Sequence, residues 1–138
     1  MKLLLIIIST LTINALGNGY TAISELDGVK YETTILEKDL VGVNKVNVKD
    51  KLPITLPQAV SLSEKALLKN FKGSRLFLHR VSVQRMGENQ PWFYKVTYKS
   101  KSMRNGLEYI VLMNGRLIEP KTLGKDFKIP KGPNPFEE

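Results

Sequence analysis

The chain has 138 residues, which is room for one domain with short extensions. It has no cysteine and a single histidine, so disulfides, a thiol nucleophile and a two-imidazole zinc site are excluded. Its formal net charge is +8, and 16 of its 21 cationic residues are lysines. Because lysine is a strongly hydrated point charge, this balance favours a solvated exterior with diffuse attraction to anionic surfaces.

Residues 1–17 predict a secretory signal peptide. Lys2 precedes an apolar run that starts at Leu3, and Ala15-Leu16-Gly17 fits a small-x-small cleavage pattern. Cleavage is expected after Gly17, with Gly19 as the alternative. A transmembrane helix needs about 20 uninterrupted apolar residues, and polar residues break this run earlier. The mature protein is therefore expected to be periplasmic or secreted, where nucleic acid is not an expected partner. Export without cysteine fits a bacterial envelope protein.

Residues 18–51 form an N-terminal extension in this interpretation. Within it, the stretch VKYETTIL, Val29 to Leu36, alternates apolar and polar residues after an Asp27-Gly28 turn. This alternation predicts one strand. An extended leader without pairing is the alternative interpretation of the same stretch.

An amphipathic helix of about four turns is predicted to begin after Thr55. Thr55 is a good N-cap, and Gln58 lies three residues later, as a capping box requires. Pro57 falls in the first turn, where its missing N–H costs nothing. Gly73 is placed to end the last turn. The apolar face is made of small residues, and the other face carries Glu64, Lys65, Lys69 and Lys72.

Three runs after the helix have the period of two residues that is typical of strands: Arg75 to Arg85, Trp92 to Ser100 and Leu107 to Met113. Asn114-Gly115 is a two-residue hairpin signal that leads into a short strand. The fold class is therefore α+β, with one amphipathic helix packed on a three- to four-stranded antiparallel meander in a domain of residues 52–120. Residues 121–138 are rich in proline and lysine and predict an unpacked tail.

The middle run separates its rings from its cations. One face of the predicted strand carries Trp92, Tyr94, Val96 and Tyr98, and the other carries Phe93, Lys95, Thr97 and Lys99. A single-stranded nucleic-acid platform needs rings and cations on one surface, so the first set is predicted to pack under the helix and the second to face water. The second set is the candidate binding surface. A plain solvated face is the alternative.

The stretches ITLPQAVSLSEKAL, WFYKVTY and EYIVLMNGRLIEP are similar to the helix opening, central aromatic strand and final hairpin of the PepSY domain family. The resemblance covers roughly Leu52 to Pro120. It implies a PepSY- or cystatin-like arrangement in an extracytoplasmic module. Such modules occur in peptidase propeptides and envelope proteins, and they are proposed to bind or restrain peptidases. The resemblance brings no catalytic residues.

No GxSxG, GxGxxG or P-loop motif occurs in the chain. His79 lies between Phe77 and Val81, on the apolar face of its predicted strand, so it is interpreted as a packed or edge histidine. We expect no catalytic, cofactor-binding or metal-binding residue. A hydrolase of unrecognised type remains a rival, and it would need a cleft with convergent polar groups.

The predicted function is that of an exported, non-enzymatic binding module for a protein or peptide partner, such as a peptidase that it restrains. The alternative is a basic envelope-associated protein held by anionic polymers or lipid surfaces. A region of about 66 residues without disulfides or metal is near the lower limit for a stable domain. Additional burial is expected from the strand at residues 29–36, from a homodimer formed through an open sheet edge, or from a partner strand.

Overall fold

The computed structural model describes residues 19–47 and 49–123, so the predicted signal peptide and most of the predicted tail lie outside the described residues. The elements follow in the order β1 (Gly19–Leu26), β2 (Val29–Leu36), the 3-10 helix η1 (Glu37–Leu40), α1 (Leu56–Asn70), β3 (Phe77–Gln84), β4 (Phe93–Lys99), β5 (Leu107–Leu112), β6 (Leu117–Ile118) and β7 (Lys121–Thr122). Within this part of the chain, no helix is long and apolar enough to span a membrane.

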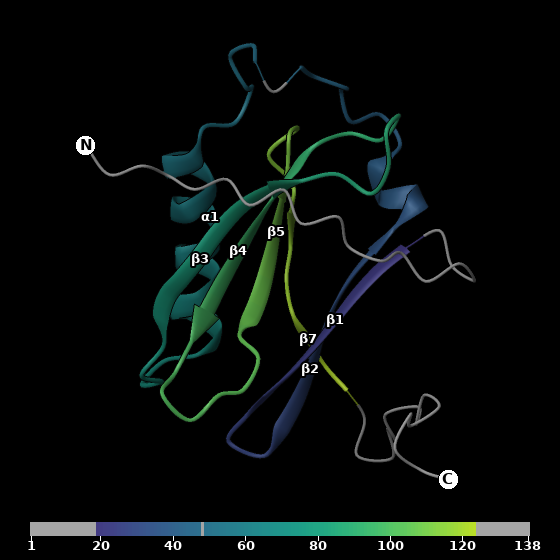
Figure 1. Ribbon diagram of the computed structural model, residues 1–138. Helices are drawn as coiled ribbons and strands as arrows, with labels where there is room; N and C mark the ends of the chain where they lie inside the picture. The colour runs from purple at the N-terminus through teal and green to yellow at the C-terminus, as the bar shows by residue number, and fades with distance from the viewer. Residues whose placement is uncertain (1–18, 48, 124–138) are drawn as a thin grey trace, which may run out of the picture.

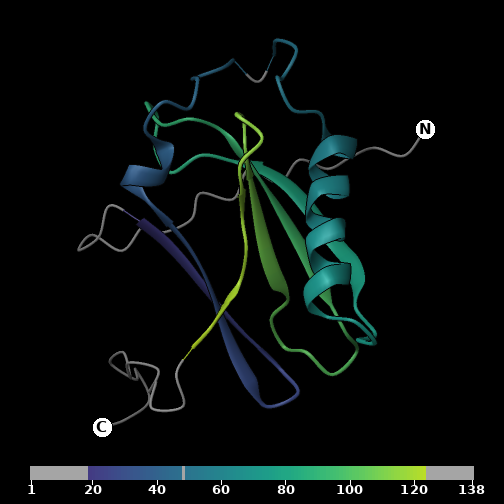
Figure 2. The ribbon, with the colours of Figure 1, turned by 180° about the vertical axis from the view of Figure 1, so that it is seen from behind.

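The elements form three layers. The middle layer is an antiparallel sheet in the order β3-β4-β5-β6, which confirms the predicted α+β meander. Helix α1 packs on β4 and β5 from one side, and the β1–β2 hairpin crosses β5 on the opposite side (Figures 1 and 2). Residues 41–47 and 49–55 lie between η1 and the helix, at one end of the sheet.

Helix α1 begins where the capping box predicts. The Thr55 hydroxyl accepts a hydrogen bond from the Gln58 N–H at 3.3 Å, and the Gln58 side chain accepts one from the Thr55 N–H at 2.8 Å. Two tyrosines of β4 fix the helix to the sheet. The Tyr98 hydroxyl lies 2.9 Å from the Ser63 hydroxyl, and the Tyr94 hydroxyl donates to the Ile54 carbonyl at 2.7 Å.

The prediction for the helix-facing side of β4 is confirmed for Tyr94, Val96 and Tyr98, which are at most 3% exposed. Trp92 differs from it, because it precedes β4 and is half-buried. The guanidinium carbon of Arg85 lies 4.8 Å from the centroid of the Trp92 ring. Within that distance a cation and an indole ring attract each other, so Trp92 packs against the core with one part of its ring and contacts Arg85 of the β3–β4 connection.

The N-terminal segment contributes a full hairpin rather than one strand. Asp27 and Gly28 both have positive φ, 51° and 79°, as a two-residue hairpin turn with right-handed twist requires. All eight residues of β1 pair with β2. Side chains of this segment belong to the main core, where Ile35 is fully buried and Leu40 and Val43 are nearly so. This segment is therefore part of the fold.

The first two residues of the predicted tail belong to a strand. Lys121 and Thr122 form β7, which pairs with Glu32 and Tyr31 of β2. Because β6 belongs to the meander and β7 to the hairpin sheet, the chain passes from one sheet to the other at Glu119 and Pro120. The second sheet has the order β1-β2-β7.

The prediction that the second face of β4 is open to water is wrong for three of its four residues, since the Lys95 side chain is only 12% exposed. Phe93 is 1% exposed and Thr97 is 8% exposed. The expectation was that an antiparallel sheet keeps one face solvated. The sequence-distant β1–β2 hairpin instead crosses β5 on this side of the meander, and its Tyr20 ring lies against Lys95.

The predicted alternation in β3 is also wrong at one point. The register with β4 shifts between Leu78 and Arg80, so His79 is an extra residue in a β-bulge. The bulge places Phe77 on the same face as its partner Lys99, opposite to the side that Val81 and Val83 share. His79 is an exposed edge residue, as one of its two interpretations stated, but it does not lie on the apolar face.

The β5–β6 hairpin forms at the predicted Asn-Gly step with one more residue in its loop. The Leu112 N–H donates to the Arg116 carbonyl, and the Gly115 N–H donates to the Leu112 carbonyl, both at 2.9 Å. These bonds close a three-residue loop in which Gly115, with φ of 85°, takes the left-handed position.

Candidate functional site

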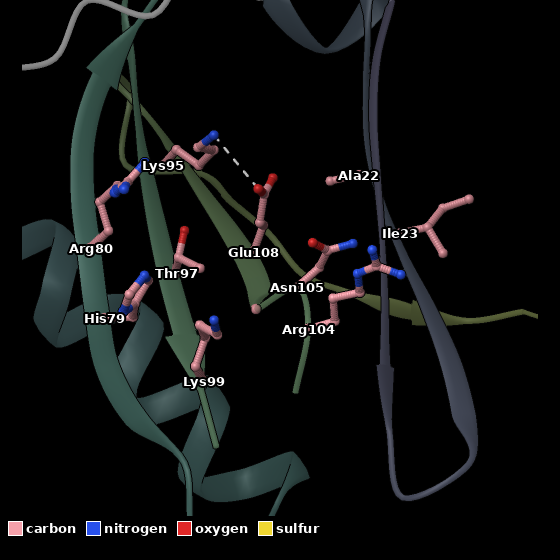
Figure 3. Close-up of a pocket in the computed structure, with 11 residues that line it drawn as sticks. Ala22, Ile23, His79, Arg80, Lys95, Thr97, Lys99, Arg104, Asn105 and Glu108 are labelled. Atoms are coloured by element: carbon pink, nitrogen blue, oxygen red, sulfur yellow. Dashed lines mark ion pairs between the residues drawn. The ribbon is translucent and has the colours of Figure 1, made fainter. Parts of the chain in front are cut away.

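A pocket of about 370 Å³ lies between β1 and the part of the meander that the hairpin leaves uncovered (Figure 3). Strands β3 and β4 form one wall, and the segment before β5 closes one end. The lining residues are Ala22, Ile23, His79, Arg80, Lys95, Thr97, Lys99, Arg104, Asn105, Gly106 and Glu108. Four of these carry a permanent positive charge and one carries a carboxylate, so the pocket is basic.

The floor of the pocket joins the two sheets through Glu108. One carboxylate oxygen of Glu108 lies 3.5 Å from the Lys95 ammonium nitrogen, and the other accepts a hydrogen bond from the Tyr20 hydroxyl at 2.5 Å. The Lys95 nitrogen also lies 5.8 Å from the centroid of the Tyr20 ring. The Lys95 and Glu108 side chains are only 12% and 16% exposed. The Glu108 carboxylate is therefore engaged on both oxygens by groups that tie β1 to β4 and β5.

Tyr20 acts in this network as a donor. Its burial raises its pKa well above the ordinary value for tyrosine, and the negative charge of Glu108 and the hydrogen bond to it raise the pKa further. The phenol therefore stays protonated at physiological pH. A second hydrogen bond joins the hairpin to β5, because the Thr33 hydroxyl donates to the Glu108 carbonyl at 2.6 Å.

The remaining cations surround the mouth of the pocket. Arg80 and Arg104 are exposed and Lys99 is half-buried. Among residues 19–47 and 49–123, no carboxylate forms an ion pair with any of these three side chains. Arginine offers a planar fork of donors that matches the oxygens of carboxylate and phosphate groups. The arrangement is suited to holding an anionic group between β3, β4 and the segment before β5.

Gly106 shapes the end of the pocket because it lies close to β4. A Cβ atom at this position would fall 2.7 Å from the Tyr98 carbonyl oxygen and 2.8 Å from the Lys99 Cγ atom. It would also collide with the methyl group of Thr97. Only a residue without a side chain lets the segment that carries Arg104 approach β4 this closely.

The structure brings together three of the four residues of the predicted binding surface. Lys95, Thr97 and Lys99 line the pocket, whereas Phe93 belongs to the core and lies outside it. The alternation of β4 was the signal that identified these three residues.

The sequence analysis did not select Arg80, Arg104 or Glu108. Arg80 alternates with Val81 and stands opposite Thr97, so the period of two residues already places it on the face of the meander that lines the pocket. Arg104 lies in a connection whose path only the tertiary structure defines. The Lys95–Glu108 pair follows from the β4–β5 register, in which Lys95 stands opposite Ile110 and Thr97 opposite Glu108.

The described residues contain no cluster of three or more histidine, cysteine, aspartate or glutamate residues that could hold a metal ion. The residues that line the pocket offer mainly hydrogen-bond donors and positive charge. No family model, curated protein or solved structure matches this chain. What the fold and the site define is an α+β protein of three layers with a basic pocket between its two sheets.

Proposed function

We propose that this chain is an exported, non-enzymatic binding module that takes an acidic segment of a protein or peptide partner into the basic pocket. The observation that carries the proposal is a group of three cations around the pocket, Arg80, Lys99 and Arg104. None of the three forms an ion pair with a carboxylate among the described residues. Unpaired positive charge around a concave site raises the local concentration of anionic ligands and strengthens their binding.

The extracytoplasmic location in this proposal rests on the predicted signal peptide of residues 1–17. The partner class rests on the resemblance to the PepSY family, which implies a peptidase or another envelope protein. Activity of the peptidases that the source organism secretes, measured with and without the purified chain, tests whether the module restrains one of them. If the activity of every peptidase is unchanged, the module does not restrain them, and only the binding of an acidic segment remains proposed.

The pocket can be tested with a labelled octapeptide of alternating glutamate and valine, followed by fluorescence anisotropy. The variant Arg80→Gln/Arg104→Gln removes two of the three unpaired cations. We expect it to weaken binding by roughly two- to thirtyfold, because two exposed charge pairs of roughly 0.2–1 kcal/mol each sum to roughly 0.4–2 kcal/mol.

The matched control is Lys65→Gln/Lys69→Gln. Both lysines are exposed on α1, on the opposite side of the meander from the pocket, and the control removes the same amount of charge. We expect it to leave the affinity nearly unchanged. Equal weakening by both double variants would contradict the proposal, since it would show that attraction is diffuse over the whole surface.

A second candidate function is attachment to anionic polymers or lipid surfaces. It is favoured by exposed lysines far from the pocket, among them Lys45, Lys49 and Lys72. Cosedimentation with phosphatidylglycerol vesicles, compared with phosphatidylcholine vesicles, tests it. Because exposed charges are screened within about 10 Å at 0.1 M salt, such binding is expected to disappear at high ionic strength.

A further inference from the structure

The open edge of the second sheet lies beside the basic pocket. β1 is the outermost strand of the order β1-β2-β7, and its residues Ala22 and Ile23 line the pocket. Figure 3 shows the side chain of Ala22 pointing toward the pocket and that of Ile23 pointing away from it. The uncovered parts of β3 and β4 face this edge across the pocket.

The ladder shows which main-chain groups of β1 are turned toward that open edge. The Leu123 N–H donates to the Lys30 carbonyl at 2.9 Å, so the main chain of Lys30 faces β7. Because main-chain groups alternate along a strand, Thr33 faces β1 and exchanges bonds with Ala22, its partner in the register. Every second residue of β1 therefore turns its N–H and C=O groups away from β2. These residues are Thr21, Ile23 and Glu25.

The edge of β1 is a better template for an added strand than the other free edges. Its pairing with β2 runs without a register shift over all eight residues. The edge strand β3 is interrupted by the bulge at His79, and the edge strands β6 and β7 have only two residues each. Bulges and short strands are features that protect an edge against pairing, and β1 shows neither of them.

The positive charge of the pocket indicates which kind of strand would add to β1. In a strand added to β1, every second side chain would point toward the face of the meander that carries Arg80, Lys99 and Arg104. Resting on the function proposed above, we infer that an acidic peptide segment adds to β1 as an extended strand and directs alternate carboxylates at these three cations. A second copy of this chain, with a net charge of +8, lacks that complementarity.

The variant Ile23→Pro tests the added strand. Proline removes the Ile23 N–H, which faces the open edge, and leaves the hydrogen bonds of Ala22 and Ser24 to β2 in place. We expect the alternating glutamate–valine octapeptide to bind Ile23→Pro at least about tenfold more weakly, and Ile23→Ala, the control, nearly as well as the parent. Thermal unfolding of the two variants shows whether the hairpin is retained.

Two isomers of the octapeptide give a test that needs no variant protein. One isomer has N-methyl groups on every glutamate and the other on every valine, so they have equal charge and equal numbers of methyl groups. In a strand, the two sets of amides lie on opposite edges. In an antiparallel strand added to β1 with its carboxylates toward the pocket, the valine amides face β1. Only the glutamate-methylated isomer is therefore expected to bind, and equal binding of both isomers would overturn the inference.

The outcomes separate this inference from the proposed function. If Arg80→Gln/Arg104→Gln weakens binding but Ile23→Pro and both methylated isomers do not, the pocket binds acidic groups and strand addition is wrong. If the octapeptide does not bind the parent chain, both proposals fail. Light scattering that shows a dimer of the parent chain, lost in Ile23→Pro, would replace the peptide by a second copy and overturn the inference.

Discussion

Tyr98 and Tyr109 form an edge-to-face ring pair, with centroids 5.7 Å apart, but only one of their hydroxyls has a partner. The Tyr98 hydroxyl lies 2.9 Å from the Ser63 hydroxyl, whereas the Tyr109 hydroxyl is buried without a hydrogen bond among the described residues. A buried polar group without a partner costs about 1–3 kcal/mol. The two hydroxyls are therefore expected to differ in their effect on stability.

We expect Tyr109→Phe to keep or raise the free energy of unfolding, because it removes an unsatisfied hydroxyl and keeps the ring contact. Tyr98→Phe is expected to lower it by about 1 kcal/mol, because Ser63 loses its partner. Urea unfolding followed by tryptophan fluorescence measures both variants. A loss in Tyr109→Phe as large as that in Tyr98→Phe would show that the Tyr109 hydroxyl has a partner after all.

Gly106 is the second residue whose environment makes a sharp prediction. Gly106→Ala is expected to lower the free energy of unfolding by about 1–3 kcal/mol, the usual cost of overpacking, since the added methyl group would meet the Tyr98 carbonyl oxygen at 2.7 Å. Gly87→Ala is the control, because its Cβ would meet only the Gln90 Cγ atom at 3.7 Å. Similar stability of the two variants in urea would contradict this account of the pocket end.

At the scale of elements, the β1–β2 hairpin is the element that differs most from its prediction. The 3-10 helix η1 that follows it carries Asp39, which forms an ion pair of 3.2 Å with Arg116 beside the β5–β6 loop. The hairpin itself contributes Tyr20 to the Lys95–Glu108–Tyr20 network and one side of the pocket. Its inward residue Ile35 has no exposed surface. The hairpin is therefore part of the core and of the site together.

Ile35→Ala tests whether the hairpin folds with the rest of the molecule. We expect the free energy of unfolding to fall by about 2–5 kcal/mol, as for other buried aliphatic residues that are cut to alanine, in a single transition. Ile23→Ala, on the outer face of the same hairpin, is expected to have a small effect. A normal stability of Ile35→Ala would mean that the hairpin detaches without unfolding the meander.

At the scale of the whole molecule, buried tyrosines make stability depend on alkaline pH. Burial raises the pKa values of Tyr20, Tyr94, Tyr98 and Tyr109 and is the largest cause for each. Tyrosine in an unfolded chain ionises near pH 10. Because the folded state holds its phenol protons to higher pH, the stabilisation is complete below about pH 10 and is lost as the pH rises above it.

The free energy of unfolding is therefore expected to be nearly constant from neutral pH to about pH 9 and to decrease above pH 10. Urea titrations at a series of pH values measure this profile. The variant Tyr109→Phe removes one of the four phenols and is expected to show a shallower decrease. A profile that is flat to about pH 11 would contradict the assignment of these phenols to the folded interior.

Local features of this protein follow directly from its sequence. The capping box at Thr55 and Gln58, the Asp27-Gly28 turn and the alternation of β4 involve residues a few positions apart, and each appears in the structure. The helix and the order of the meander were predictable for this reason, and three of the four residues selected from the alternation of β4 line the pocket.

The features that only the tertiary structure decided join residues that are distant in the chain. Tyr20 contacts Glu108, which lies 88 positions later in the chain. The alternation of β4 predicts that its second face is solvated, because it does not reveal that a hairpin from residues 19–36 packs on this side of the meander. The bulge at His79 likewise depends on the pairing of β3 with β4. Periodicity and turn chemistry determine which elements form. The packing of one layer on another decides which faces stay open, and the basic pocket lies where the layer formed by the β1–β2 hairpin ends.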